Sequence, residues 1–416
     1  MSAPENSTQP LTQPSTQPSK SGSGPDQQRV GVTAPQGFRA AGVTAGLKQA
    51  GTPDVAVVIN EGPVFAAAGV FTSNRVKAAP VRWCESVLSG PGAELTAVVL
   101  NSGGANACTG PEGYADTVAT AEQLGALLGV PAGRVAVAST GLIGLRLPMD
   151  ILLPGIGKAV GAASVSGGLD AATAIMTTDS VPKTVQVTTS GFTVGGMAKG
   201  AGMLAPGLAT MLVILTTDAI ADAAALDTAL RAATRVSFDR LDSDGAMSTN
   251  DTVLLLASGA SGVEPAAELL GAAVTRACTQ LAEQLLADAE GATKEIAIEV
   301  VHAASEDDAV EVGRSVARNN LVKTAFFGQD ANWGRILAAV GTVGPSVEFD
   351  ADAIDVAING VWICRAGATG DDRDAVDLTG RSVRVAIDLH AGTESATILT
   401  NDLSHAYVHE NSAYST

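Results

Sequence analysis

Two spacings of apolar residues alternate along the chain. Compact runs of aliphatic and β-branched residues, four to eight long, are typical of buried strands, whereas apolar residues recurring every three to four positions indicate amphipathic helices. The compact runs begin at Val55, Leu95, Arg134, Thr210, Thr252, Glu295, Ile354 and Ser382. The helical spacing covers 115–128, 223–235, 265–289 and 305–317. This mixture predicts an α/β protein.

The longest uncharged stretch covers residues 200–217, within "KGAGMLAPGLATMLVILTTDA". Its length is sufficient to span a bilayer. However, Pro206 and several glycines interrupt it, and no basic flank sets an orientation. We therefore interpret it as a glycine-rich loop followed by a buried strand, which places Thr210 at the point where the strand begins.

Composition and charge narrow the class of protein. The 416 residues, 46% of them hydrophobic, are sufficient for one large or two ordinary domains. The net charge of −18 argues against nucleic-acid or anionic-membrane partners. Residues 1–28 repeat Thr-Gln-Pro and contain no apolar signal segment, so we expect a disordered tail on a cytoplasmic protein.

Metal and nucleotide motifs are weak in this sequence. The cysteines have no CxxC spacing, which favours free buried thiols, and the acids of 242–251 lack the spacing of a calcium loop. Neither a P-loop nor a GxSxG elbow occurs. We assign no metal and no cofactor. The cysteines are Cys84, Cys108, Cys278 and Cys364, and the histidines are His302, His390, His405 and His409.

Three glycine-rich segments, 101–110, 139–144 and 195–203, are predicted as loops beside strand ends, where backbone amides can converge. Thr210 is the sharpest candidate for chemistry. An internal threonine is a poor nucleophile, but cleavage before it would expose an α-amino group with a reference pKa of about 7.7–8.0. That amine could act as the base for its own hydroxyl.

Nine motifs indicate a known family. "STGLIG", "MTTD", "GGMAKGAGMLAP", "LATML", "TNDT", "DAEGATK", "LVKTA", "NWGR" and "HENSAYST" occur in this order. Beyond the N-terminal tail, the chain resembles the ornithine acetyltransferase (glutamate N-acetyltransferase) family of the cyclic arginine pathway. The resemblance implies that acetyl passes from N-acetyl-L-ornithine to L-glutamate through an acetyl-Thr210 intermediate, without a cofactor. Use of acetyl-CoA as a second donor stays open.

The resemblance also assigns site residues. Self-cleavage between Ala209 and Thr210 would give an α chain, 1–209, and a β chain, 210–416. Thr210 would be the nucleophile, and Thr140 with Gly141 would form the oxyanion hole. Lys199 would bind the carboxylate of an amino-acid substrate. Glu290, which we expect to end the long helix, would bind the substrate's amino group. The full set of implied substrate-binding residues is Thr177, Lys199, Thr210, Glu290, Asn411 and Thr416.

The implied architecture is an αββα-type main domain, 29–300, with a smaller C-terminal α/β domain, 301–416, whose tail returns to the site. The resemblance also implies a heterotetramer of two αβ units. Two alternatives remain. An N-terminal nucleophile hydrolase, such as an aminopeptidase or amidase, would use water as acceptor, and a non-catalytic amino-acid-binding protein would never cleave itself.

Overall fold

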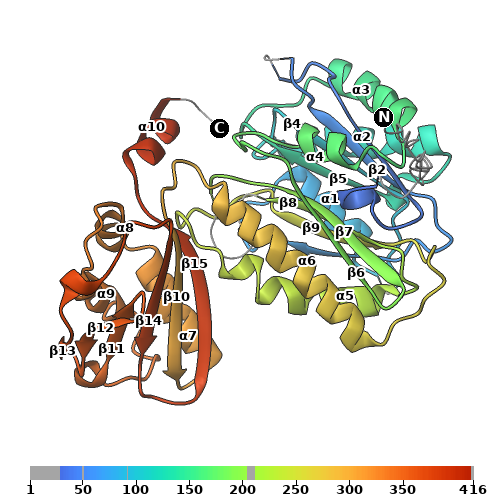
Figure 1. Cartoon of the computed structure of the whole chain (residues 1–416). Helices are drawn as coiled ribbons and strands as arrows, with labels where there is room; N and C mark the ends of the chain where they lie inside the picture. The colour runs from blue at the N-terminus through green and yellow to red at the C-terminus, as the bar shows by residue number, and fades with distance from the viewer. Residues whose placement is uncertain (1–28, 49–50, 91, 204–210, 414–416) are drawn as a thin grey trace, which may run out of the picture.

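The computed structural model describes residues 29–48, 51–90, 92–203 and 211–413, and it contains three β-sheets with helices around them (Figure 1). The first sheet has the order β1-β2-β4-β5, formed by β1 (Phe38–Val43), β2 (Val55–Asn60), β4 (Ala97–Ser102) and β5 (Val135–Thr140). The second has the order β3-β9-β8-β7-β6, formed by β3 (Ala67–Phe71), β9 (Thr252–Ala257), β8 (Leu212–Thr217), β7 (Phe192–Lys199) and β6 (Lys183–Thr189).

These two sheets pack face to face and are covered by helices on their outer faces. Apolar side chains of β2, β4, β8 and β9 share one buried cluster between the sheets, including Val58, Leu100, Ile214 and Leu254. A second cluster joins the outer face of the first sheet to α2 (Gly110–Leu128) and α3 (Met149–Ala162). A third joins the second sheet to α5 (Ala223–Arg235) and α6 (Ala267–Ala287). The expected αββα layering is therefore confirmed.

The third sheet lies to one side of these layers (Figure 1). Its order is β13-β12-β11-β14-β10-β15, from β13 (Ala368–Thr369), β12 (Val361–Arg365), β11 (Asp355–Ile358), β14 (Ser382–Asp388), β10 (Glu295–Ala303) and β15 (Glu394–Asn401). It shares a core with α7 (Glu306–Ala317), α8 (Asn320–Phe327) and α9 (Trp333–Val340). The remaining helices are α1 (Ala79–Val87), α4 (Gly168–Ala174) and α10 (His405–Ala413).

All eight compact apolar runs form strands, and all four helical spacings form helices, with Ser305 accepting from the Asp308 amide as the N-cap of α7. One of the loop predictions was wrong. The glycine-rich segment before Thr210 is partly strand, because β7 extends to Lys199. A Cβ on Gly195 would lie 2.1 Å from the Gly31 carbonyl oxygen, so glycine is required there by close packing and not by a turn.

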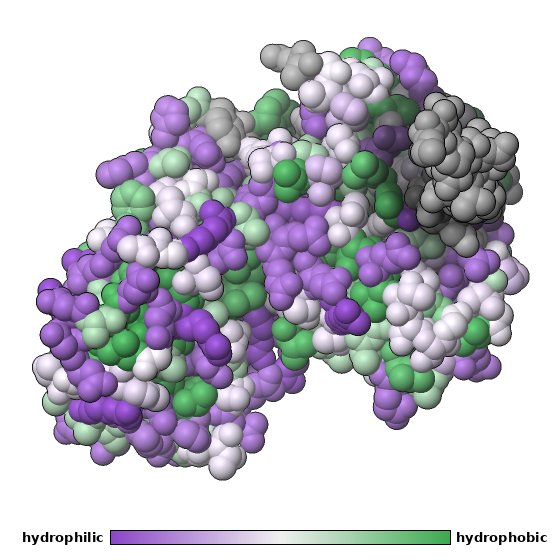
Figure 2. Space-filling model, in the orientation of Figure 1, coloured by the Kyte–Doolittle hydropathy of each residue, from purple (hydrophilic) through white to green (hydrophobic). Residues whose placement is uncertain are grey.

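All four cysteines are free, as expected, but only three of them are buried, because Cys108 is exposed. No helix within the described ranges is long and apolar enough to cross a membrane. On the face shown in Figure 2, apolar residues are scattered among polar ones, as is usual for a protein surface.

Candidate active site

The site is built where the two packed sheets end. Thr140 is the last residue of β5 and is 3% exposed. Its carbonyl oxygen accepts from the amides of Gly103 and Gly104, both at 3.0 Å. Gly141 follows with φ +123°, and a Cβ there would lie 2.7 Å from the Gly104 nitrogen. Only glycine fits this turn, which holds the Gly141 amide against the 103–104 loop.

Lys199 reaches Thr140 from the other sheet. It is the last residue of β7 and is 2% exposed, and its Nζ donates to Thr140 Oγ1 at 3.3 Å. In the antiparallel pairing of β7 and β8, Lys199 lies opposite Leu212. The lysine therefore lies between the expected oxyanion pair and the strand that begins two residues after Thr210.

Buried charges surround this lysine. Asp179 Oδ1 accepts from the Gly200 amide at 2.6 Å and from Lys183 Nζ at 2.7 Å, and Lys183 also binds Asp288 at 2.6 Å. Burial lowers the pKa of Lys199, although the negative charge of Asp179 opposes this. Burial alone would raise the pKa of Asp179, but the charges of Lys199 and Lys183 bring it below the ordinary value. The network thus couples Lys199 to a fixed carboxylate.

Thr177 joins this network through its backbone, because its amide donates to Asp179 Oδ2 at 3.0 Å. Its side chain is exposed. Thr177 thus lies two positions before Asp179, the carboxylate whose charge acts on Lys199. The structure records no direct contact between Thr177 and Lys199.

Glu290 lies beside the segment that follows Lys199. Its amide donates to the Ala201 carbonyl at 2.9 Å, and its Oε2 accepts from Asn411 Nδ2 at 2.9 Å. A Cβ on Gly202 would lie 2.6 Å from the same carboxylate oxygen. The structure therefore brings two expected binding residues, Glu290 and Asn411, into direct contact, and it turns α10 back toward the α6 end.

Glu290 does not end the long helix, as the sequence led us to expect. Helix α6 ends at Ala287 with Asp288 as its C-cap, so Glu290 lies in the turn that follows and not in the helix. Gly291 has φ +62°, and a Cβ there would lie 2.2 Å from the Tyr407 nitrogen. That glycine makes room for α10 and explains the Glu-Gly pair better than a helix cap does.

Asp251 is a residue that sequence analysis left without a role. Its carboxyl is fully buried, and Oδ1 accepts from the Met211 amide at 3.1 Å. Its Oδ2 has no partner within hydrogen-bond geometry in the described parts of the chain. Burial raises the pKa of Asp251 well above its usual value. The available signal was an acid directly before the buried run of β9.

The other acids of the 242–251 loop bind separate partners. Asp242 pairs with Arg318 at 2.7 Å, and Asp244 accepts from the Met203 amide at 2.7 Å. Ala209, Thr210 and Thr416, three of the expected site residues, lie outside the described residues.

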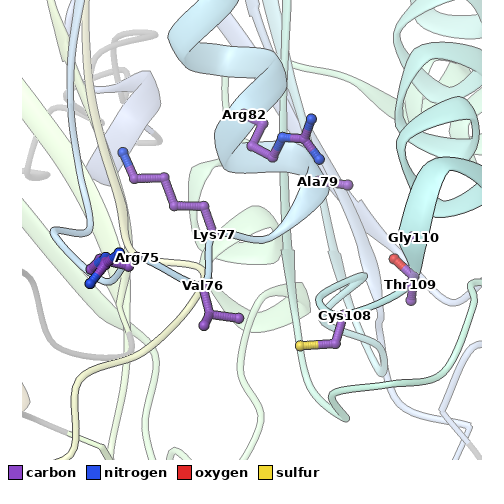
Figure 3. Close-up of a pocket in the computed structure, with 8 residues that line it drawn as sticks. All are labelled: Arg75, Val76, Lys77, Ala79, Arg82, Cys108, Thr109 and Gly110. Carbon is purple, nitrogen blue, oxygen red and sulfur yellow. The ribbon is translucent and has the colours of Figure 1, made fainter.

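A basic pocket of about 570 Å³ is lined by residues of the 75–82 segment and of the 108–110 loop (Figure 3). The chain carries a net charge of −18, yet Arg75, Lys77 and Arg82 all line this cavity. The loop that contributes Cys108 and Thr109 is hydrogen-bonded to the loop after Gly141, through Ala105 to Leu142 and Gly144 to Ala107, both at 2.9 Å. The pocket therefore shares a loop wall with the expected oxyanion hole.

Comparisons with known proteins agree over most of the chain. A model of the ArgJ family matches residues 39–416. The arginine biosynthesis bifunctional protein ArgJ of Streptomyces avermitilis is 64% identical over 384 residues, covering 92% of this chain and 99% of that protein. The protein of the same name from Thermobifida fusca is 60% identical over 385 residues, covering 92% of this chain and 100% of that protein.

Solved structures give a more partial match. The ornithine acetyltransferase of Mycobacterium tuberculosis, solved with ornithine, is 58% identical with a TM-score of 0.42, over 44% of this chain and 96% of that one. The Bacillus halodurans arginine biosynthesis bifunctional protein is 34% identical with a TM-score of 0.44, over 48% and 97%. From the family model and the full-length relatives, the chain belongs to the ArgJ family.

Proposed function

We propose that this protein is a bifunctional acetyltransferase of arginine biosynthesis, which moves acetyl from N-acetyl-L-ornithine to L-glutamate through Thr210. The observation that carries this proposal is the contact of Lys199 with Thr140 beside the start of β8. Donors for a developing oxyanion and a cation for a substrate carboxylate meet there, directly after the residue that would be the nucleophile.

The reaction begins with self-cleavage. The Thr210 hydroxyl adds to the Ala209 carbonyl, the C–N bond breaks as the nitrogen takes up a proton, and water then hydrolyses the resulting ester. The new α-amine, with a reference pKa of about 7.7–8.0, accepts the Thr210 hydroxyl proton in each later attack. Acetyl then passes from N-acetylornithine to Thr210 with release of ornithine, and from Thr210 to the amine of glutamate.

Thr140 and Gly141 stabilise the oxyanion in both transfers. Because Lys199 donates to Thr140 Oγ1, the threonine hydroxyl is free to donate its own proton to the developing charge. The Gly141 amide supplies a second donor from its tight turn. Preorganised donors of this kind are usually the largest single contribution to acyl-transfer catalysis.

The substrates would be held by the charged groups around this point. Lys199 binds the α-carboxylate that ornithine and glutamate share, and Glu290 with Asn411 binds an amino group. Thr177, Thr210 and Thr416 complete the binding set implied by the family. The buried network of Asp179 and Lys183 keeps Lys199 in place and acts through it.

Asp251 serves as a positioning residue for the nucleophile. Its Oδ1 fixes the Met211 amide, which is covalently bonded to Thr210. A fully buried carboxyl that binds the first amide after the cleavage point supports a rigid start to β8. Burial raises the pKa of Asp251, so this carboxyl holds a negative charge less readily than an exposed aspartate does.

The basic pocket supports acetyl-CoA as the second donor. Coenzyme A carries phosphate groups, and arginine and lysine are the side chains that bind phosphate. Arg75 and Arg82 have no ion-pair partner in the described parts of the chain. A phosphorylated donor bound there would approach the oxyanion hole from the side of the shared loop.

A mass spectrum followed by two assays tests the main proposal. The mass spectrum should show two chains, the second of which begins at Thr210. The assay should show that N-acetylglutamate forms from N-acetylornithine and glutamate. Thr210→Ala should remain one inactive chain. Acetate as the product would favour the hydrolase instead, and an intact wild-type chain that still binds ornithine would favour the binding protein.

A further inference from the structure

Two histidines and an aspartate meet at the far end of the six-stranded sheet. His302 lies in β10 and Asp388 ends β14, the parallel neighbour of β10, while His390 follows two residues later. His302 Nδ1 lies 2.9 Å from both oxygens of Asp388, and His390 Nδ1 lies 3.4 Å from Asp388 Oδ1. Thus half of the histidines in the sequence converge on one carboxylate.

The backbone fixes both rings in this arrangement. The His302 carbonyl accepts from the amides of Ala391 at 2.7 Å and Gly392 at 2.8 Å, which ties the 389–392 turn to a bulge in β10. His302 and His390 both have left-handed backbone, with φ 52° and 51°. This conformation is uncommon outside glycine and persists only where neighbouring contacts impose it.

A second carboxylate orients His390. Its Nε2 lies 3.2 Å from Asp355 Oδ2, and Asp355 is itself held by Arg365 at 3.0 Å and by the Ala366 amide at 2.7 Å. A histidine whose one nitrogen donates to a fixed carboxylate presents the other nitrogen as an acceptor. This pairing is the usual outer-shell support of a metal-binding histidine.

We propose that His302 Nδ1, the Asp388 carboxylate and His390 Nδ1 form a binding site for a divalent transition metal, of which Zn²⁺ fits best. The ligand atoms lie within 4.8 Å of one another. Bonds of about 2.0–2.1 Å in a tetrahedron place neighbouring ligands about 3.3 Å apart, close to the 2.9 and 3.4 Å found here. Two imidazoles and one carboxylate suit Zn²⁺, and soft thiolates are not needed.

The site is open to solvent on one side. The side chains of His302 and His390 are 55% and 45% exposed, whereas that of Asp388 is 11% exposed. The buried carboxylate therefore forms the floor, and the rings form a rim through which an ion can enter. A water molecule or an external ligand would take the fourth position.

This site is separate from the candidate active site. Glu290 precedes the first residue of β10, while His302 lies near its last. His302 lies seven positions after Glu295 along the strand, which corresponds to roughly 23 Å at about 3.3 Å per residue. In Figure 1 the six-stranded sheet extends away from the two packed sheets. The proposal therefore does not depend on the acetyl-transfer mechanism.

The test uses full-length protein, made without a histidine tag and freed of metal by chelation. Titration with Zn²⁺ should show one ion bound per 416-residue protein, which after cleavage means one per β chain, with release of protons. Co²⁺ in its place should give the intense visible bands of a tetrahedral ion. The double variant His302→Asn/His390→Asn should lose at least 100-fold in Zn²⁺ affinity. Asparagine tolerates left-handed backbone, so this variant keeps the fold, as its melting temperature without metal will show.

Two further variants separate a built site from adventitious binding. His409→Ala removes an exposed histidine elsewhere and should leave the stoichiometry and affinity unchanged. Asp355→Asn leaves all three proposed metal ligands in place and removes only the charge that orients His390, and it should weaken Zn²⁺ binding about 10–100-fold. Absence of stoichiometric binding in the wild type, or full binding in the double asparagine variant, would overturn the proposal and leave the cluster as a hydrogen-bonded turn.

Discussion

The ammonium of Lys199 and the hydroxyl of Thr140 lie 3.3 Å apart, although they end strands of two different sheets. In this contact the Thr140 hydroxyl oxygen accepts from lysine, which leaves the hydroxyl proton free to be donated to another group. Thr140→Ala should lower kcat about 10²–10³-fold in both half-reactions, because a preorganised oxyanion donor is lost. Thr140→Ser keeps the hydroxyl and should stay within about tenfold. Steady-state rates with each acetyl donor measure this. An unchanged kcat in Thr140→Ala would leave only the Gly141 amide in this role.

Lys199 and Glu290 should separate the two substrates by charge. Lys199→Met should impair both half-reactions by more than about 2 kcal/mol, since both substrates lose the partner of the same carboxylate. Glu290→Gln keeps the shape and should impair mainly the steps in which a cationic amine is bound or released. The measurement is kcat/KM for N-acetylornithine and for glutamate separately.

Exposed Glu283 on α6 offers a matched control, because Glu283→Gln removes the same charge outside the site. It should leave both constants unchanged. Loss of only one half-reaction in Lys199→Met would show that this lysine reads one substrate and not the shared carboxylate.

Replacing Asp251 should affect self-cleavage according to how well the new side chain accepts from Met211. Asp251→Asn retains an acceptor and should still be processed. Asp251→Leu leaves the buried Met211 amide unpaired, at a cost of about 1–3 kcal/mol, and should accumulate uncleaved precursor. The fraction of cleaved chain over time, by intact mass, distinguishes the two. Equal cleavage rates in both variants would refute the positioning role.

The basic pocket should matter only for a phosphorylated donor. Arg75→Gln/Arg82→Gln should lower kcat/KM for acetyl-CoA about 10²–10⁴-fold, because each of the two charge-assisted hydrogen bonds lost contributes about 1.5–3 kcal/mol. The same variant should be within twofold of wild type with N-acetylornithine and with acetyl-pantetheine, which carries no phosphate. An equal loss with all three donors would place the defect in the fold and not in phosphate binding.

Lys323 should give the folded protein a distinctive pH dependence. Its ammonium is buried against Thr400 and Asn401, and burial lowers its pKa to about 8 from 10.5. Between these two values the unfolded chain binds more protons than the folded one, so the free energy of unfolding should rise with pH, by up to about 3 kcal/mol. Lys323→Met should remove this slope. Denaturant unfolding at pH 7.5 to 10.5 tests it, with exposed Lys158→Met as the control.

Fully buried strands were predictable because their apolar runs are uninterrupted, as in "VAVVIN" of β2 and "TVLLLA" of β9. Strand β7 was missed because "FTVGGMAK" contains glycines that packing against Gly31 requires, and such glycines resemble loop signals. A single sequence does not reveal which backbone will pass within contact distance of a glycine.

The candidate site was predictable only as far as the family resemblance reaches. Lys199 and Thr140 are 59 positions apart and meet because two sheets end together, which no local pattern encodes. Asp251 escaped notice because an acid before a strand is usually solvated, whereas this one is fully buried. The cluster of His302, Asp388 and His390 was missed because metal motifs are recognised by close spacing, and 86 positions separate its first two members.

The order β3-β9-β8-β7-β6 has a mechanical consequence for a chain cut at Thr210. Strands β8 and β9 would then belong to one polypeptide, while β3, β7 and β6 on either side belong to the other. The six paired positions between β7 and β8, from Val194–Thr217 to Lys199–Leu212, would become contacts between separate molecules. The α and β chains would contribute neighbouring strands to one sheet, so neither chain could dissociate without breaking the hydrogen bonds between those strands. An α chain and a β chain that are produced separately should therefore fail to form the active enzyme when mixed. The sheet that joins them forms only while both segments fold as one uncut precursor.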